Sequence, residues 1–378
     1  MTDTDALLAT TRLTIDLGAI AGNWRALDAL AHGAETGAAV KANAYGLGAA
    51  KVVPALAAAG CKTFFAALPG EAIEVRKATK TGRLFVLAGL GPATADAYLK
   101  HGLIPVLNSL GEIETWQQVA TKAGRPLPCA LHFDTGMSRL GIEAGEAKRI
   151  FTEPGLLDGI DPVLIMSHLA CADMPSHRLN GEQKRRFDTI RMMFPEVAAS
   201  LANSAGVLAD AGMACDLTRP GIALYGGQAL SSGMGPIAPA VTFEARILQI
   251  RNTKKGETVG YGATKTLERD SRIAVAGAGY ADGYFRAASG SGVAMRQVCT
   301  GAKGAIGGHV LPILGRISMD LTTFDVTDVP EQVLEAAEWI ELIGHTIALE
   351  DYANAAGTIG YEVLTRIGPR AERVYLGG

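Results

Sequence analysis

Lys41 is the residue of this chain whose surroundings best suit chemistry. It follows the small apolar run 37–40 and precedes Ala42, Asn43 and Ala44. Such a strand gives an ammonium group little water, and burial lowers the pKa of a lysine. A lysine with a lowered pKa can attack a carbonyl group and form an imine. The alternative is an ordinary lysine at a strand end, with its stem buried and its charge in water.

Five more polar residues stand at comparable positions, at or just beyond the carboxyl end of a predicted strand. They are Asn108, Asp134, His168, Asn203 and Arg219. In a (β/α)8 barrel this end of the strands carries the active site, so residues distant in sequence meet at one mouth. A solvated loop explains any one of them, but it explains the set less well.

The elements that must position these residues alternate between short apolar runs and Ala-rich stretches, which is typical of βα units with a parallel sheet. We predict eight strands, at 37–41, 63–67, 83–87, 104–107, 129–133, 163–167, 199–202 and 216–219. Helices are predicted at 50–59, 70–80, 110–123, 146–152 and 182–193. Eight is the number of strands that closes a (β/α)8 TIM-type barrel.

The sequence changes character near residue 238, where helical stretches become rare and glycines mark frequent corners. This pattern predicts a mostly antiparallel β domain after the α/β barrel, with two late helices at 332–337 and 349–356. We place the barrel at 12–240 and the β domain at 241–378, and we expect residues 1–11 to pack with the β domain.

Composition limits the possible functions. The net charge of −3 gives no electrostatic case for nucleic acid, which would require a basic patch, and no apolar run reaches the ~18 residues of a membrane span. Acidic residues at positions 3 and 5 do not suit a secretory signal, so we expect a cytoplasmic protein. Five scattered cysteines and seven dispersed histidines show no zinc spacing, and we predict no metal.

Residues 40–48 (Val-Lys-Ala-Asn-Ala-Tyr-Gly-Leu-Gly) resemble the pyridoxal-phosphate lysine segment of the alanine racemase family. Seven further segments resemble family motifs in the family's order: 133–141, 167–170, 202–206, 219–226, 279–284, 315–320 and 360–363. The resemblance therefore covers the whole chain. It implies a barrel followed by a β domain, a homodimer with shared active sites, and interconversion of L-alanine and D-alanine, which supplies D-alanine for cell-wall synthesis.

The resemblance also implies roles for individual residues. Lys41 would hold pyridoxal phosphate as an imine and then act as the base for D-alanine, while Tyr280 would act as the second base, for L-alanine. Arg139 and the backbone N–H of Met319 would bind the substrate carboxylate. The cofactor-binding residues would be Lys41, Tyr45, His168, Asn203, Ser204, Arg219, Gly221, Ile222 and Tyr361. Tyr284 would lie beside the entrance.

Several of these residues also have plainer interpretations. Ser204 precedes a short predicted helix at 205–211, so it could be an ordinary N-cap. Arg219 could pair with a carboxylate, His168 could be a core histidine, and Tyr280 could pack in a turn with one hydrogen bond. If Arg219 faces the pyridine nitrogen, that nitrogen stays neutral, because a guanidinium has no proton to give.

One position departs from the family pattern. Many members carry a carbamylated lysine two residues before the aspartate of the Asp-Thr-Gly-Met motif, and this chain has His132 there. Another acid or a bound anion could hold Arg139, or the arginine could be less constrained.

Two rival functions remain at this point. One is a racemase of broader amino-acid range. The other is a non-catalytic carrier of pyridoxal phosphate, similar to single-domain barrel proteins. Segment 241–378, which supplies Tyr280, weighs against the carrier.

Overall fold

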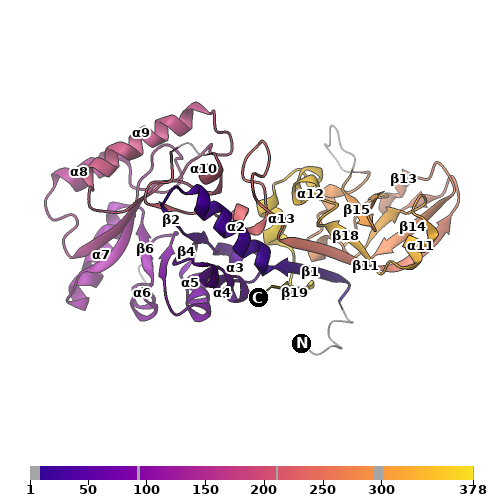
Figure 1. The fold of residues 1–378 in the computed structure, drawn as a ribbon, viewed down its shortest axis with the longest axis horizontal. Helices are drawn as coiled ribbons and strands as arrows, with labels where there is room; N and C mark the ends of the chain where they lie inside the picture. Colours follow the sequence, from indigo (N-terminus) through magenta and orange to yellow (C-terminus); the bar gives the residue numbers. More distant parts are fainter. Residues whose placement is uncertain (1–8, 92–93, 210–211, 293–300, 378) are drawn as a thin grey trace. The chain divides into compact units, whose positions relative to one another are not determined.

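The computed structural model describes residues 9–91, 94–209, 212–292 and 301–377. The chain forms two compact units. We call Gly18–Ala238 the barrel unit, and we call the unit that joins the residues up to Leu17 with those from Pro239 onward the β unit. Figure 1 labels many of the elements of both.

The barrel unit is built on a seven-stranded parallel sheet whose strands follow one another in chain order. Its strands are β3 (Ala38–Ala39), β4 (Thr63–Ala66), β5 (Arg83–Val86), β6 (Ile104–Leu107), β7 (Leu127–His132), β8 (Ile160–Met166) and β9 (Ala199–Ser200). β2 (Glu35–Thr36) and β10 (Leu217–Thr218) form a short parallel pair. Each of the eight strands predicted from the sequence overlaps an observed one.

Backbone hydrogen bonds join the short pair to both ends of the seven-stranded sheet. On one side, Gly37 donates to the Thr218 carbonyl at 3.0 Å and Ala39 donates to the Pro220 carbonyl at 2.9 Å. On the other, Asp216 donates to Ala199 and Arg219 donates to Ala202, both at 2.9 Å. The sheet therefore curls round on itself, and the prediction of a TIM-type barrel is confirmed.

Helices follow most strands and lie around the sheet in Figure 1. They are α2 (Leu17–Leu30), α4 (Ala49–Ala59), α5 (Pro69–Ala78), α6 (Ala95–His101), α7 (Leu110–Ala123), α8 (Ala144–Thr152), α9 (Arg178–Met193) and α10 (Ser204–Leu208), with a 3₁₀ turn η1 (Ile222–Tyr225). The predicted helices at 50–59, 70–80, 110–123, 146–152 and 182–193 are confirmed, with ends that differ by up to four residues. α2 and α6 were not predicted.

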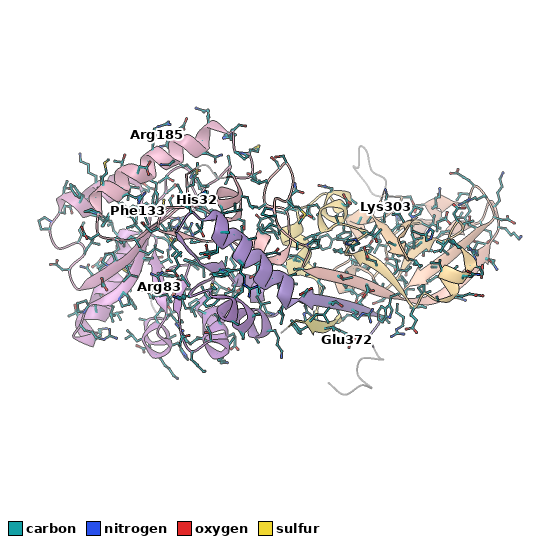
Figure 2. The ribbon with its side chains drawn as sticks, in the orientation of Figure 1. His32, Arg83, Phe133, Arg185, Lys303 and Glu372 are labelled. Atoms are coloured by element: carbon teal, nitrogen blue, oxygen red, sulfur yellow. The ribbon has the colours of Figure 1, made fainter. Side chains whose placement is uncertain are left out.

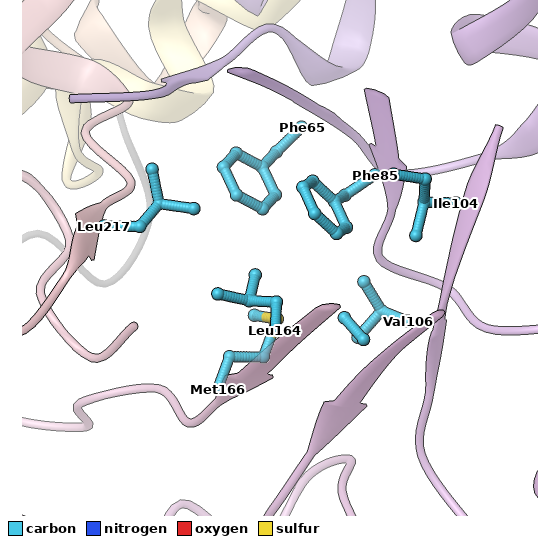
Figure 3. Packing of buried hydrophobic residues seen from close by; sticks show 8 residues of the cluster. Phe65, Phe85, Ile104, Val106, Leu164, Met166 and Leu217 are labelled. Atoms are coloured by element: carbon cyan, nitrogen blue, oxygen red, sulfur yellow. The ribbon is translucent and has the colours of Figure 1, made fainter. Parts of the chain in front are cut away.

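Side chains from the strands fill the interior of the barrel (Figure 3). The cluster consists of Phe65, Phe85, Ile104, Val106, Ala130, Leu164, Met166 and Leu217. The rings of Phe65 and Phe85 stack with their centroids 5.2 Å apart. The interior is therefore a packed core, and polar chemistry is confined to the strand ends. Burial of each large apolar side chain contributes about 1.5–3 kcal/mol.

The β unit contains an eight-stranded sheet that is antiparallel except for the parallel pair β1–β19. Its strands are β1 (Thr11–Asp16), β11 (Val241–Thr253), β14 (Ser271–Ala276), β15 (Lys303–Ile306), β16 (His309–Pro312), β17 (Thr322–Asp325), β18 (Trp339–Ile343) and β19 (Glu372–Leu376). β12 (Thr258–Val259) and β13 (Lys265–Thr266) form a separate pair. The prediction of a mostly antiparallel β domain is confirmed.

Short helical segments complete the β unit. They are η2 (Tyr261–Ala263), η3 (Tyr280–Asp282), η4 (Arg286–Ala288), α11 (Glu331–Glu335), α12 (Leu349–Ala356) and α13 (Gly360–Arg366). α11 and α12 match the two predicted late helices, and α13 was not predicted. Figure 2 labels Phe133, which follows β7 in the barrel unit, and Lys303, which begins β15 in the β unit.

β1 pairs with β11 and β19, so residues 11–16 lie in the sheet of the β unit. The domain ranges 12–240 and 241–378 stay a prediction. Residues 1–8 of the segment expected to pack with the β domain lie outside the described residues. Within the described ranges, no helix combines the length and the apolar character that crossing a membrane requires.

Candidate active site

Lys41 stands where the first strand of the barrel sheet ends and an unusual turn begins. The turn, α3 (Lys41–Tyr45), contains four consecutive non-glycine residues in the left-handed region, with φ of 51° at Ala42, 56° at Asn43, 54° at Ala44 and 56° at Tyr45. L-residues avoid this region because Cβ crowds the following carbonyl, at a cost of about 1–2 kcal/mol each. Surrounding contacts must therefore hold this turn.

Two side chains provide such contacts. The Asn43 Oδ1 atom accepts a hydrogen bond from the Ala49 N–H at 2.8 Å, which ties the turn to the start of α4. The Glu71 Oε1 atom accepts a hydrogen bond from the Ala42 N–H at 2.9 Å. These hydrogen bonds to α4 and α5 thus fix the backbone orientation at Lys41.

Tyr45, Ser204 and Gly221 come together beside the turn. Ser204 Oγ accepts hydrogen bonds from the N–H groups of Gly221 at 2.8 Å and Ala223 at 3.3 Å. A Cβ atom at position 221 would collide with the Tyr45 hydroxyl. The absence of a side chain at Gly221 therefore lets the Tyr45 hydroxyl approach the turn that Ser204 holds, so that two hydroxyl groups and a polar backbone turn lie near one another, which suits a phosphate group.

Asn203 and Ile222 flank this cluster. Asn203 is the N-cap of α10, because its Oδ1 atom accepts a hydrogen bond from the Gly206 N–H at 2.9 Å. Ile222 is buried and begins the turn η1. The plain N-cap interpretation thus applies to Asn203, while Ser204 faces the backbone of Gly221 and Ala223.

Arg219 is buried and is hydrogen-bonded to neutral groups. Its guanidinium donates to the Ser167 carbonyl at 2.6 Å and to Ser200 Oγ, and it lies 3.5 Å from His168 Nδ1. Among the described residues it forms no ion pair, so the carboxylate-paired interpretation does not hold. Burial lowers the pKa of Arg219 to about 10, which leaves it charged at neutral pH.

His168 is a neutral imidazole in this setting. Burial is the largest cause that lowers its pKa, to about 3, and the charges of Arg219, Arg139 and Lys41 add to it. The side chain therefore accepts or donates a hydrogen bond without carrying charge.

Arg139 is exposed at the end of a tightly held loop. The Asp134 Oδ1 atom accepts hydrogen bonds from the N–H groups of Gly136 at 2.8 Å, Met137 at 2.9 Å and Ser138 at 3.2 Å. Burial alone would raise the pKa of Asp134, but these N–H donors bring it below the usual value. An ionised Asp134 thus shapes the loop that presents Arg139.

His132 is held by Asn108 rather than by a charge. Its Nδ1 atom lies 2.7 Å from Asn108 Oδ1, and Asn108 Nδ2 donates to the Val106 carbonyl at 2.9 Å. Because Asn108 presents an acceptor, His132 carries its proton on Nδ1 and leaves Nε2 as an acceptor. Burial, with Arg219 and Arg139, lowers the pKa of His132 to about 4. In the described part of the chain, Arg139 makes no ion pair.

The Lys41 amine lies in this positive surrounding. Burial lowers the pKa of Lys41 most, and the charge of Arg139 lowers it further, whereas Glu71 raises it. Arg219 also lowers it. A larger fraction of the amine is therefore uncharged near neutral pH than for a lysine in water, as imine formation requires. Within the described ranges, no cluster of His, Cys, Asp and Glu is arranged to hold a metal ion.

The β unit carries Tyr280 and Met319 on two loops in backbone contact. The Tyr280 N–H donates to the Ser318 carbonyl and the Ala281 N–H donates to the Met319 carbonyl, both at 3.0 Å. The Tyr280 side chain is 42% exposed and the Met319 side chain is 53% exposed. Both are free to meet a ligand or another chain.

Tyr361 and Tyr284 differ in exposure. Tyr361 lies in the first turn of α13 and is 37% exposed. Tyr284 is fully buried and stacks on Tyr352, with ring centroids 4.7 Å apart. The expectation that Tyr284 lines an entrance is therefore wrong, because its ring belongs to the core of the β unit.

Three polar residues of these sites were missed from the sequence. Glu71 contacts the Lys41 turn, and Glu112 Oε2 accepts a hydrogen bond from the Asn108 N–H at 2.7 Å. Arg370 bridges Asp320 and the buried Asp282. Glu71 is the third residue of its helix after the Leu68 N-cap, a position that indicates a cap rather than a functional contact.

A parallel barrel that carries, at a strand end, a lysine whose pKa is lowered by burial, followed by a mostly antiparallel β unit, defines a class of two-domain barrel proteins. Two family models match the chain: "Alanine racemase, N-terminal domain" over residues 15–229 and "Alanine racemase, C-terminal domain" over residues 240–375. The chain belongs to the alanine racemase family.

Individual relatives agree with this assignment. A protein of Rhizobium meliloti named alanine racemase is 45% identical over the full length of both chains. One of Agrobacterium fabrum, named alanine racemase, biosynthetic, is 44% identical and covers 99% of this chain and 96% of its own. The crystal structure of alanine racemase from Bartonella henselae with covalently bound pyridoxal phosphate has a TM-score of 0.89 at 36% identity, and covers 97% of this chain and all of its own.

Proposed function

We propose that this protein is a pyridoxal-phosphate-dependent alanine racemase that interconverts L-alanine and D-alanine and supplies D-alanine for cell-wall synthesis. Family membership over the full length supports the reaction. The observation that carries the assignment of the site is the turn Lys41–Tyr45, which joins a lysine whose pKa is lowered by burial to the cluster of Tyr45, Ser204 and Gly221.

These residues fit the cofactor. Lys41 would hold it covalently, and Ser204, Tyr45 and the N–H groups of the Gly221–Ile222 turn would bind its phosphate. When bound, pyridoxal phosphate withdraws electrons from the substrate Cα and so acidifies the Cα–H bond. Arg219 would contact the ring nitrogen without protonating it, since guanidinium stays charged and has no proton to spare.

The remaining residues would move the proton and bind the substrate. The Lys41 amine would remove or deliver the Cα proton of D-alanine, and the Tyr280 hydroxyl would do so for L-alanine on the opposite face. Arg139 would bind the substrate carboxylate through its two-pronged guanidinium, and Met319 would bind it through its backbone N–H. His168 supports this arrangement as an uncharged neighbour of Arg219, and Asn203 and Tyr361 complete the cofactor site.

Chiral chromatography of L-alanine incubated with the cofactor-loaded protein tests the proposal, beside L-serine and L-lysine. We expect equal amounts of the two alanine enantiomers at the end point and little change in the other amino acids. Comparable conversion of lysine would indicate a racemase of broad amino-acid range. No conversion of any of the three amino acids would favour the non-catalytic carrier of pyridoxal phosphate.

The proposal includes a homodimer in which Tyr280 completes the site of the partner subunit. The exposure of Tyr280, Met319 and Tyr361 supports it. Mixing two inactive variants, Lys41→Ala and Tyr280→Phe, is a direct test, because a heterodimer with shared sites contains one intact site. After subunit exchange, we expect recovery of up to about a quarter of the wild-type activity. Failure to recover activity despite exchange would contradict shared sites.

We also propose a cytoplasmic location and no nucleic-acid partner. The net charge of −3 supports the second of these, and the acidic residues at positions 3 and 5 support the first. Cell fractionation against a periplasmic marker tests the location.

A further inference from the structure

We propose that Glu71 is a positioning residue for Lys41, which holds the left-handed turn behind the lysine and contributes a negative charge to the surroundings of the amine. The inference rests on the proposed function of Lys41 as the cofactor-binding lysine. It assigns a role to a side chain outside every motif that the sequence singled out.

The geometry of the Glu71 carboxylate is the first support. Its Oε2 atom accepts hydrogen bonds from the N–H groups of Ala67 at 3.0 Å and Leu68 at 3.3 Å, at the start of its own helix α5. Its Oε1 atom accepts from the Ala42 N–H at 2.9 Å. One carboxylate therefore joins the ends of two barrel strands, β3 and β4, because Ala67 directly follows β4.

The identity of the donor is the second support. The Ala42 N–H belongs to the peptide that links Lys41 to Ala42, so its partner fixes the orientation of the chain at Lys41. Inside the turn, Ala44 donates to the Val40 carbonyl at 2.9 Å and Gly46 donates to the Ala42 carbonyl at 2.7 Å. Those bonds close the turn on itself, whereas the Glu71 bond anchors it to the barrel.

Charge is the third support. The charged groups that act on the Lys41 amine are the cations Arg139 and Arg219 and the carboxylate of Glu71. His168, on which the charge of Lys41 acts, is itself neutral. Burial and the two arginines lower the pKa of Lys41, and Glu71 opposes them. Loss of the carboxylate would therefore favour the uncharged amine at a lower pH.

The plain alternative is that Glu71 only caps its helix, and the chain offers a matched control. Glu146 holds the same position in α8, where its Oε2 atom accepts a hydrogen bond from the Glu143 N–H at 3.2 Å. If capping is the whole role, then Glu71→Gln and Glu146→Gln will change the protein in the same way.

The test measures capture of pyridoxal phosphate by the full-length, cofactor-free protein. The rate is followed by absorbance between about pH 6 and pH 10, with Lys41→Ala as the blank. Borohydride reduction and peptide mass analysis establish that Lys41 is the residue modified. Wild type is compared with Glu71→Gln, Glu71→Ala and Glu146→Gln.

We expect the Glu71→Gln profile to shift to lower pH by about 0.5 pH unit or more, because a negative charge near the amine is lost. Glu71→Ala should show the same shift and a maximal rate about 10-fold lower, because one of the two side-chain anchors of the turn is lost. Glu146→Gln should follow the wild type in both respects.

The inference would be wrong if the pH dependence of the capture rate is the same for Glu71→Gln and wild type, and the maximal rate of Glu71→Ala is unchanged. The proposed function would remain intact in that case. Equal shifts in Glu71→Gln and Glu146→Gln would also overturn the inference. Absence of Lys41 modification in the wild type would instead overturn the proposed function, and the inference with it.

Discussion

The two turns that present the proposed proton-transfer residues are built in opposite ways. The Lys41 turn places four non-glycine residues in the left-handed region and relies on Asn43 and Glu71 to hold it. The Tyr280 turn is flanked by Gly279 and Gly283, against which the backbones of other loops pack closely. The first turn therefore depends on side-chain hydrogen bonds to neighbouring helices. The second has one internal side-chain hydrogen bond, from the Gly279 N–H to Asp282 Oδ2 at 2.9 Å, and depends mainly on the close backbone approach that its glycines allow.

The largest effect should follow from Gly279→Ala. A Cβ atom at this position would collide with the carbonyl oxygens of Ser318 and Met319, which are backbone atoms and cannot rotate away. We expect a loss of about 3 kcal/mol or more in the free energy of unfolding. In calorimetry this should lower the melting temperature by roughly 6 °C or more.

Gly145→Ala is the control for this substitution. Gly145 lies in α8, and a Cβ atom there meets nothing within 4 Å. Alanine should stabilise this helix by about 0.5–1 kcal/mol. A mild effect of Gly279→Ala, similar in size to the control, would show that the Tyr280 turn is not closely packed.

A smaller effect should follow from Arg370→Met. Arg370 Nη1 lies 2.8 Å from Asp320 Oδ1, and its Nε lies 3.2 Å from Asp282 Oδ1 in an ion pair without hydrogen-bond geometry. The arginine thus joins the Tyr280 and Met319 loops. Because its side chain is half exposed, we expect a loss of only about 1 kcal/mol at neutral pH.

The pH dependence of this loss has a defined sign. Burial raises the pKa of Asp282. A carboxyl group whose pKa is raised in the folded protein favours the folded state when protonated, and this benefit disappears as pH rises through that pKa. Toward about pH 4 Asp282 becomes protonated and no longer forms an ion pair with Arg370. The difference in melting temperature between Arg370→Met and the wild type should therefore become smaller at that pH. Arg269→Met, which breaks an exposed pair with Asp328, should leave the melting temperature unchanged.

The smallest effect should follow from Ala42→Gly. Glycine relieves left-handed strain of about 1–2 kcal/mol and loses about 0.5–1 kcal/mol through backbone entropy. We expect the free energy of unfolding to stay within about 1 kcal/mol of wild type. A destabilisation as large as that of Gly279→Ala would show that the Lys41 turn is not strained.

The sequence predicted the barrel well because its strands are short apolar runs that end in polar residues, as at Ile104–Leu107 before Asn108. It did not predict the left-handed turn after Lys41, because alanine has no preference for that conformation and only tertiary contacts enforce it. The role of Glu71 was missed for the same reason, since Ala42 is 29 residues away in the chain.

The β unit was predicted less completely. The Gly-rich corners indicated its turns, but side-chain direction depends on packing, and Tyr284 was therefore expected at an entrance although it stacks in the core. The sequence showed that His132 replaces the lysine of the family pattern. It could not show the hydrogen bond between His132 and Asn108, because that contact depends on how two neighbouring strands are arranged.

The buried guanidinium of Arg219 links ligand affinity to the folding of the barrel. Its hydrogen-bond partners are a hydroxyl, a carbonyl and an imidazole, so the cofactor-free barrel keeps a positive charge in a place with little water. Such a charge raises the free energy of the folded state. A ligand that accepts hydrogen bonds from this guanidinium will bind the folded chain and not the unfolded one, and will thereby stabilise the barrel unit by an amount that grows with the logarithm of the ligand concentration. The buried charge of Arg219 therefore makes the equilibrium stability of the barrel unit depend on whether a ligand is bound beside it.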